Sequence, residues 1–311
     1  MRAATRLLAG TVTVLAASAA GAQSTGIVLQ LPASARAAAL GNAYVAAGQD
    51  DAMIFYNPAQ LEPGDRRRWA AGASVQRYAG ESHAAALSTA RRVGPGHFGV
   101  GLQMLDYGSI PEVVADPDYG GERGRETGAR ISARDFALSI GYGMQVAPFR
   151  VGATAKVVQQ QVANLSDATA ALDIGIATGS PLGLFAFAMQ NSGGLLSVGS
   201  TTASLPLLYR IGFQLFPMPI GRTTLVNLFE WSRDREGSYV FSGGSELQMP
   251  AGGYRLAARI GLRARRDEGS AGSRVTFGGG LASRGLALDY GYQTIEGINL
   301  GTHRVGVRWW R

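Results

Sequence analysis

The amino-acid sequence predicts an all-β fold: a transmembrane antiparallel β-barrel of about 14 strands, with an N-terminal helical or irregular plug in its lumen. Three observations favour this fold. After Gly64 the chain forms runs of roughly ten residues in which apolar and polar side chains alternate. Short and long connections between the runs also alternate, as they do on the two rims of an outer-membrane barrel. The stretch from Leu31 to Leu61, in contrast, is rich in small residues and has no strand pattern.

Residues 1–22 have the pattern of a secretory signal peptide. Arg2 and Arg6 form its basic start, residues 7–19 its apolar run, and Ala20-Gly21-Ala22 its cleavage site. A membrane-spanning helix is the alternative, but the apolar run is shorter than the roughly 20 residues that such a helix needs. The absence of cysteine excludes a lipid anchor at the cleavage point and a disulfide framework. We therefore expect export to the periplasm or the outer membrane of a bacterium.

Residues 23–65 are predicted to form the plug, and residues 66–311 the barrel. Ser34 can cap a short helix over residues 36–40 that a left-handed Gly41 ends. Asp50 and Asp51 can cap a second turn, and Asn57 followed by Pro58 opens a third. The residues that we expect to fix the plug are Gly41, Asn42, Tyr44, Asp50, Asp51, Tyr56, Asn57 and Pro58.

The barrel strands follow in sequence order. Asp135–Val146 is the clearest, with Phe136 and Ile140 on one face and Asp135 and Ser139 on the other. Residues 223–231 fit either register, and residues 106–132 are predicted to be the longest loop. Strands are predicted to begin near Trp69, Ser82, Gly96, Ala133, Phe149, Ala168, Leu182, Leu205, Gly221, Gly237, Gly253, Gly272, Gly285 and Leu300.

The charge on these strands decides which face meets lipid. Arg or Lys at the bilayer midplane costs roughly 2–4 kcal/mol on the lipid face, so strand charges should point into the lumen. A soluble, lipocalin-like barrel with its two faces exchanged is the alternative, but it would expose rows of large apolar side chains to water. The predicted lumenal charges are Asp135, Lys156, Asp173, Arg210, Arg255, Arg259, Arg263, Asp289, Arg304 and Arg308.

The last strand carries aromatic residues suited to the membrane interface. Trp309 and Trp310 fit the aromatic girdle of an outer-membrane barrel. An aromatic-rich C-terminal strand is also typical of clients of the barrel-assembly machinery, although the terminal Arg311 departs from the usual aromatic end. Outer-membrane lipid and the assembly machinery are therefore predicted partners.

Net charge does not indicate nucleic-acid binding. Without the two arginines of the signal peptide, 27 basic and 22 acidic residues remain, a net charge of +5. Lys156 is the single lysine, and the arginines lie singly along strands instead of in a cluster. We therefore expect no nucleic-acid partner.

The chain also shows no pattern of catalytic residues. His83, His97 and His303 lie on three different strands, and the chain has no G-x-S-x-G nucleophile elbow of the kind that an outer-membrane lipase or acyltransferase could use. The segment Asp116 to Glu122 offers oxygen ligands for calcium but lacks EF-hand spacing, and a solvated acidic loop is the alternative. The prediction is a protein that is not an enzyme, with no catalytic residue, cofactor or metal site.

Several blocks of the chain resemble a known family. Residues 37–46, through Asp50-Asp51 to Tyr56-Asn57-Pro58-Ala59, resemble the opening of the PorV/PorQ family of outer-membrane proteins and, more distantly, the hatch of FadL-type channels. Two further blocks agree: residues 173–175 with 191–193 and 205–206, and residues 288–292 with 303–304. The resemblance implies a 14-stranded barrel whose N-terminal segment folds into the lumen.

The resemblance implies two candidate functions. Members of PorV/PorQ serve type IX secretion, whereas FadL-type relatives pass fatty acids or other hydrophobic compounds sideways through the wall. Because the predicted lumen is polar, we expect a non-catalytic secretion-associated or scaffolding barrel, whose partners include exported cargo proteins or secretion components. A FadL-like channel is the alternative. Residues 53–56 either form a small hydrophobic pocket or only pack the plug against the wall.

Overall fold

The computed structural model describes residues 25–48, 50–64, 67–78, 81–120, 123–267, 270–294 and 301–311. The predicted signal peptide lies outside these residues. Fourteen strands form a closed antiparallel barrel, in agreement with the predicted fold class. Each wall strand pairs with the next wall strand along the chain. The pairings of β10 with β12 and of β1 with β17 complete the ring.

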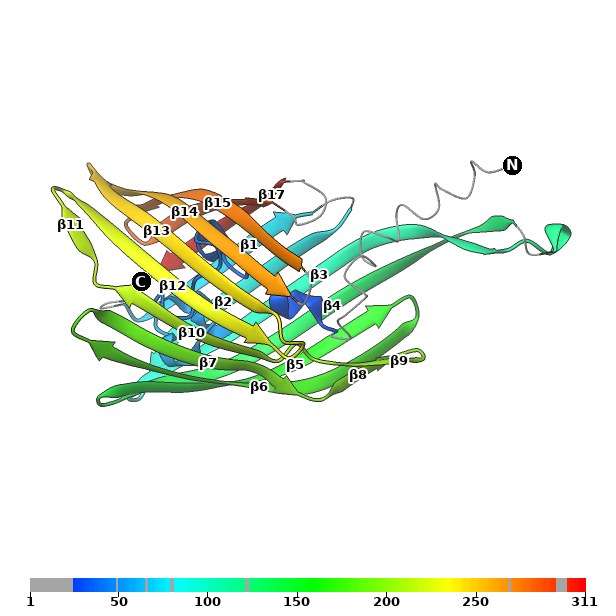
Figure 1. Ribbon diagram of the computed structural model, residues 1–311, viewed down its shortest axis with the longest axis horizontal. Coiled ribbons are helices and arrows are strands. Elements are labelled where there is room, and N and C mark those ends of the chain that lie inside the picture. Colours follow the sequence, from blue (N-terminus) through cyan, green and yellow to red (C-terminus); the bar gives the residue numbers. More distant parts are fainter. Residues whose placement is uncertain are drawn as a thin grey trace.

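The wall strands differ in length but together form one continuous sheet (Figure 1). A separate hairpin of β8 (Leu195–Val198) and β9 (Thr201–Ser204) follows β7, and the short β11 (Met218–Ile220) pairs with β12. The wall consists of β1 (Trp69–Arg77), β2 (His83–Val93), β3 (Gly96–Ala115), β4 (Gly124–Val146), β5 (Phe149–Val162), β6 (Leu165–Ser180), β7 (Gly183–Gly193), β10 (Leu208–Leu215), β12 (Thr223–Asp234), β13 (Tyr239–Ala251), β14 (Tyr254–Asp267), β15 (Ser270–Ser283), β16 (Leu286–Thr294) and β17 (Gly301–Trp310).

One predicted loop is wrong. Residues 106–132 were expected to be a long irregular connection, but β3 and β4 continue through most of it as a two-stranded hairpin that extends far beyond the barrel (Figure 1). Paired positions such as Val113 with Glu126 and Ile110 with Ile131 place β-branched residues in the hairpin and hold its two strands together. Register shifts near Asp106 and Pro111 interrupt the ladder and obscured the period-two pattern in the sequence.

The outward face of the barrel is apolar and the inward face is polar or small. On β4, Phe136 and Ile140 are exposed outward, whereas Asp135, Ala137 and Ser139 are buried inside. Because a barrel this apolar on its outside would be unfavourable in water, the distribution favours a lipid environment. The same outward pattern includes Val157, Ile174, Phe185, Ile211, Trp231, Phe241, Ile260, Phe277, Leu288 and Val305.

Residues 25–48 and 50–64, called here the N-terminal segment, lie inside the barrel (Figure 1). The segment contains four short helices: η2 (Ile27–Gln30), α2 (Ala35–Ala39), η3 (Asp51–Phe55) and η4 (Pro58–Gln60). It begins beside the β8–β9 hairpin, where the Thr25 N–H donates to the Ser204 carbonyl (3.0 Å), and it leads into β1 at the opposite rim. We call the rim at the β8–β9 hairpin the loop rim, and the rim where β1 begins the turn rim.

No helix in the part of the chain that the structure describes is both long and apolar enough to cross a membrane.

Candidate functional site: the barrel lumen

Helix α2 of the N-terminal segment is bound directly to the wall. The Ser34 Oγ accepts a hydrogen bond from the Ala37 N–H (3.3 Å) and so caps α2. Gly41 and Asn42 end this helix with φ of 65° and 62°, in the left-handed region. The Gly41 N–H then donates to the Thr276 Oγ1 on β15 (3.0 Å).

Asn57 joins three parts of the structure. Its Oδ1 accepts from the Ala59 N–H (3.1 Å) and caps η4, while its Nδ2 donates to the Val45 carbonyl (3.1 Å) in the same segment. The same Nδ2 also reaches the Phe187 carbonyl on β7 (3.4 Å). The Asn57 side chain is fully buried, so each of these bonds replaces one to water that folding removes.

Glycines in the wall make room for this turn. A Cβ added at Gly175 would overlap the Asn57 Oδ1, and one added at Gly143 or Gly152 would overlap the backbone of Pro58. The wall therefore approaches the turn more closely than any side chain permits. Pro58 itself occupies the first position of η4, where its missing N–H needs no partner.

Asp50 is buried and ionised. Its Oδ1 accepts from the Ala52 N–H (3.0 Å), and its Oδ2 accepts from the Tyr44 hydroxyl (2.6 Å) and from Arg308 on β17 (3.0 Å). Burial raises the pKa of Asp50, but the nearby Arg308 and Arg36 guanidinium groups outweigh that effect and lower the pKa to about 2.

The adjacent Asp51 has a different environment. It lacks an ion-pair partner among the described residues, and its Oδ2 accepts a hydrogen bond from the Ser88 Oγ on β2 (2.6 Å). Burial raises the pKa of Asp51, and the neighbouring Asp50 carboxylate raises it further, to about 7. The pKa values of two consecutive aspartates therefore move in opposite directions, because burial and the Asp50 carboxylate raise that of Asp51 whereas the arginines lower that of Asp50.

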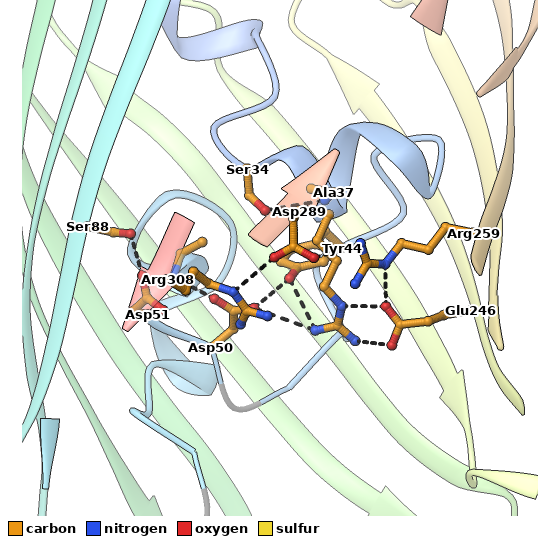
Figure 2. A network of polar contacts seen from close by, with 12 residues as sticks. Ser34, Ala37, Tyr44, Asp50, Asp51, Ser88, Glu246, Arg259, Asp289 and Arg308 are labelled. Atoms are coloured by element: carbon orange, nitrogen blue, oxygen red, sulfur yellow. Dashed lines mark hydrogen bonds and ion pairs between the residues drawn. The ribbon is translucent and has the colours of Figure 1, made fainter. Parts of the chain in front are cut away.

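A chain of alternating charges ties the N-terminal segment to four wall strands (Figure 2). Arg36 binds Glu246 of β13 through both carboxylate oxygens (2.8 and 3.0 Å). Glu246 also binds Arg259 of β14 (2.5 Å), which in turn contacts Asp289 of β16 (2.7 Å). Arg308 closes the chain between Asp289 (3.3 Å) and the carboxylate of Asp50. Each buried charge here has an opposite partner, as burial requires.

A second polar cluster, on the wall strands next to β13, holds the middle of the segment. The Glu230 Oε2 on β12 accepts from the backbone N–H groups of Tyr44 and Val45 (both 2.9 Å). Its Oε1 pairs with Arg210 of β10 (2.6 Å), and Arg210 donates onward to the Asn42 carbonyl (2.9 Å). One carboxylate thus satisfies two backbone donors that would otherwise be buried without a partner.

Tyr56 and Arg304 fix the start of α2. The Tyr56 hydroxyl accepts from the Ala33 N–H (2.8 Å), and the Ala33 carbonyl accepts from the Ser74 Oγ on β1 (2.7 Å). Arg304, buried on β17, donates to that Ser74 Oγ (2.9 Å) and to the Gln76 Oε1 (2.7 Å). Arg304 is therefore linked to the N-terminal segment by hydrogen bonds through the Ser74 hydroxyl, and not through a carboxylate.

Lys156 and Asp173 stabilise an irregularity in the wall. The Lys156 Nζ lies 2.6 Å from the Asp173 Oδ2 and donates to the Asn191 Oδ1 (2.8 Å). The backbone N–H of Asn191, a residue with φ of 60°, donates to the Asp173 Oδ1 (2.7 Å) at a register shift between β6 and β7. The Asn191 Nδ2 then binds the Pro206 carbonyl (3.0 Å), which draws the β9–β10 connection toward the lumen.

The remaining predicted charges lie apart from these clusters. Asp135 is near the loop rim, where it accepts from the Tyr107 hydroxyl (2.9 Å) and more weakly from the Val28 N–H (3.4 Å). Arg255 is exposed, because it lies one residue after the start of β14 at the turn rim. Arg263, on the same strand, is partly buried and borders a cavity.

An apolar cluster fills the lumen near the loop rim, where the sequence was expected to provide few large apolar side chains. That expectation is wrong because the N-terminal segment, the wall and the stretch around the β8–β9 hairpin each contribute one or two large apolar residues. No single strand therefore looks apolar on its inner face. Leu29 and Leu31 pack against the cluster. We call its large buried members the apolar chamber: Val28, Leu105, Val158, Leu196 and Leu205.

A small cavity lies beside the apolar chamber. It has a volume of about 60 Å³ and is bordered by Leu29 and Leu31 of the segment, Leu208 and Val240 of the wall, and several polar side chains. Residues 53–56 mostly pack against the wall, with Phe55 close to Gly101, although Phe55 and Tyr56 also border the cavity. The cavity can hold a few water molecules but not an extended hydrocarbon.

Candidate metal ligands are sparse. The described residues contain no group of three or more His, Cys, Asp or Glu side chains that could hold a metal ion. In the segment considered for calcium, the Asp116 Oδ1 accepts from the Asp118 N–H (3.1 Å), as in an ordinary capped turn, and Glu122 lies outside the described residues.

Three residues that organise the lumen were missed from the sequence. Glu230 lies on the strand whose register was ambiguous, and Glu246 follows a pair of glycines that interrupts the alternation. Arg36 stands in an alanine-rich helix and resembles an ordinary surface arginine. A rule that every carboxylate on a membrane strand faces inward would have found both glutamates, because the lipid face excludes them.

Comparisons with known proteins agree with this architecture. No family model matches the chain, and a search of curated proteins gives no match. The chain is similar to a Pseudomonas aeruginosa FadL homologue, with a TM-score of 0.58 at 10% identity over 90% of this chain and 98% of that one. It is also similar to the Ralstonia pickettii toluene transporter TbuX (TM-score 0.57, 13% identity, 92% and 97% covered) and to the Pseudomonas putida toluene transporter TodX (0.57, 10%, 84% and 94%).

Proposed function

We propose that the protein is an outer-membrane channel for hydrophobic small molecules, with the N-terminal segment as its internal gate. The likeness to FadL-type structures, two of which are toluene transporters, makes this function the first to test. The apolar chamber is the observation that carries the proposal. Aliphatic side chains inside a polar lumen offer an apolar surface to a solute that water rejects, once the chain around them moves.

The gate follows from the size of the cavity. About 60 Å³ is far below the roughly 300–1,000 Å³ of pockets that hold small ligands, so passage requires the N-terminal segment or the β8–β9 hairpin to move. Val28 belongs to the segment, and Leu196 to the hairpin. A solute entering the chamber from the loop rim would displace one or both.

The rest of the chain suits this location. We propose that residues 1–22 direct export, that residues 23–65 form the plug, and that residues 66–311 form an outer-membrane barrel inserted by the barrel-assembly machinery. The plugged barrel has no catalytic role in this proposal, and lipid surrounds its apolar outer face.

Uptake by whole cells tests the proposal. Cells that lack their own hydrophobic-compound channel would express the protein, and the entry of labelled toluene and labelled oleate would be measured. Leu205→Asn places an amide in the chamber and should reduce uptake several-fold. Leu195→Asn is the matched control, because Leu195 is 59% exposed and Leu205 only 1% exposed. Uptake equal to that of cells without the protein would refute the proposal.

A secretion-associated or scaffolding role is the second candidate, and the β3–β4 hairpin favours it. Beyond the pairings of Asp106 with His83 and of Ala133 with Val162, no wall strand among the described residues pairs with the outer edges of the hairpin. Such edges can accept a strand from another protein. Replacing residues 110–130 by a short turn should leave hydrocarbon uptake intact in the channel proposal, whereas loss of export of a cargo protein would support the scaffold.

A further inference from the structure

The cavity beside the apolar chamber is unusually basic. Arg210 of β10 and Arg263 and Arg265 of β14 all border it, together with the carboxylates of Glu230 and Asp234. It lies close to the loop rim, because its border includes Ser238 in the β12–β13 connection. Anions from outside the cell would reach it before they reached the charge network of Figure 2.

Two of the three arginines are neutralised by the wall. Arg210 lies 2.6 Å from Glu230, whose other oxygen accepts two backbone N–H groups. Arg265 donates to the Ser238 Oγ (3.1 Å) and lies 3.9 Å from Asp234. Both carboxylates that border the cavity therefore already have partners in the protein.

Arg263 is the exception. No hydrogen bond or ion pair joins its guanidinium to another side chain in the part of the chain that the structure describes. Its cross-strand neighbours are Arg274 on β15 and Ser242 on β13, and neither offers it an acidic side chain. A partly buried guanidinium without an ion pair is able to accept an anion as its partner.

The shape and chemistry of the cavity match a compact oxyanion. Its volume of about 60 Å³ is several times what one water molecule needs by this measure, which leaves space for a carboxylate or phosphate group. Ser232 and Ser242 border the same space and can donate hydroxyl hydrogen bonds. A guanidinium group is well suited to bind an oxyanion through two parallel hydrogen bonds.

We propose that this cavity is a binding site for an oxyanion of the carboxylate or phosphate class, held by Arg263 with Arg265 and the serines of β12 and β13. The site does not depend on the channel function, since it rests on the cavity and on a guanidinium that has no hydrogen bond or ion pair among the described residues. Its ligand is either a free anion or the anionic head of an amphiphile whose apolar part extends along Leu208 and Val240.

Equilibrium dialysis of the full mature chain in a non-ionic detergent tests the site. Labelled inorganic phosphate and labelled acetate would be titrated at constant ionic strength, with sodium chloride as the balancing salt. We expect saturable binding of one anion per chain that Arg263→Gln weakens about ten-fold or more, as loss of a charged hydrogen bond predicts. Arg255→Gln is the matched control, because Arg255 lies on the same strand but away from the cavity.

A second readout separates a ligand site from a structural role. Without the anion, Arg263→Gln should unfold at the same temperature as the wild type or higher, because the variant breaks no hydrogen bond or ion pair among the described residues. With phosphate, only the wild type and Arg255→Gln should gain thermal stability. A variant that unfolds at a lower temperature without anion would mean that Arg263 serves the fold, and the proposal would be wrong.

The two sources of the oxyanion are separated by chain length. Octanoate and octanol share an apolar tail but differ in charge. Binding of octanoate alone, lost in Arg263→Gln, would assign the site to the head of an amphiphile, and binding of phosphate or acetate would assign it to a free anion. Equal binding of octanol and octanoate, or binding unaffected by Arg263→Gln, would overturn the proposal, as would the absence of binding by all four probes.

Discussion

Replacing Asn57 by alanine should release the N-terminal segment without opening the barrel. The substitution removes one helix cap, worth about 1 kcal/mol, and two further hydrogen bonds of about 1 kcal/mol each. Because one of these bonds is long, at 3.4 Å, we expect a total loss of about 2–3 kcal/mol in the free energy of segment opening. Among the described residues, the Asn57 side chain is hydrogen-bonded to the wall at the Phe187 carbonyl, and its removal breaks no backbone bond between strands.

Trypsin provides a direct assay. Arg36 is the single basic residue between positions 25 and 64, so cleavage after it reports exposure of the segment. A loss of 2–3 kcal/mol raises the open population about thirty- to a hundred-and-fifty-fold, and the cleavage rate should rise in proportion when opening is fast relative to cleavage.

A matched variant and a gel control complete the experiment. Asn227→Ala removes an amide that binds Ser245 within the wall, so cleavage after Arg36 should stay at the wild-type rate. Heat-modifiable migration on an SDS gel should persist in both variants. Wild-type trypsin resistance in Asn57→Ala would refute the idea that Asn57 anchors the segment.

Three further predictions concern the contacts around the segment. Gly175→Ala should mimic Asn57→Ala in the trypsin assay, because its Cβ would overlap the Asn57 Oδ1, whereas Gly179→Ala on the same strand faces open space and should behave as wild type. Arg308→Met leaves Asp50 and Asp289 without a shared cation, so it should lower the denaturant midpoint of segment release, and an unchanged midpoint would contradict the ion network of Figure 2. The pKa of Asp51 is raised to about 7 from an ordinary value near 4, so between these pH values the folded state holds a proton that the unfolded chain has released. The free energy of unfolding should therefore fall as pH rises from about 4 to about 7 and stay level above. Asp51→Asn should remove that decline in denaturation measured from pH 4 to 8, and a decline that survives in the variant would assign it to another group.

Much of the barrel was predictable because the alternation of side chains along each strand depends only on residues close together in sequence. Alternation along a strand such as β4 fixes which side chains face lipid, and the predicted strand starts agree with the structure within three residues at every wall strand except β4. The β3–β4 hairpin was missed because it lies beyond the wall, where neither lipid nor the lumen imposes alternation on its two faces.

The lumen was harder to predict because its contacts join residues far apart in sequence. The pairing of Arg36 with Glu246 spans 210 positions, and no local pattern reveals it. The apolar chamber likewise combines Val28, Val158 and Leu205, each of which stands alone in its own stretch of sequence. Inward-facing charges could be identified, but not their partners.

The central claim is that the barrel passes hydrophobic molecules while its N-terminal segment keeps polar solutes out. The most direct test measures two solutes in the same cells, which lack their own hydrophobic-compound channel: the uptake of labelled toluene and the entry of nitrocefin, a polar β-lactam. We predict that expression of the protein raises toluene uptake several-fold and leaves nitrocefin entry at the background rate. Increased nitrocefin entry without increased toluene uptake would contradict the claim, because it would mean an open polar pore.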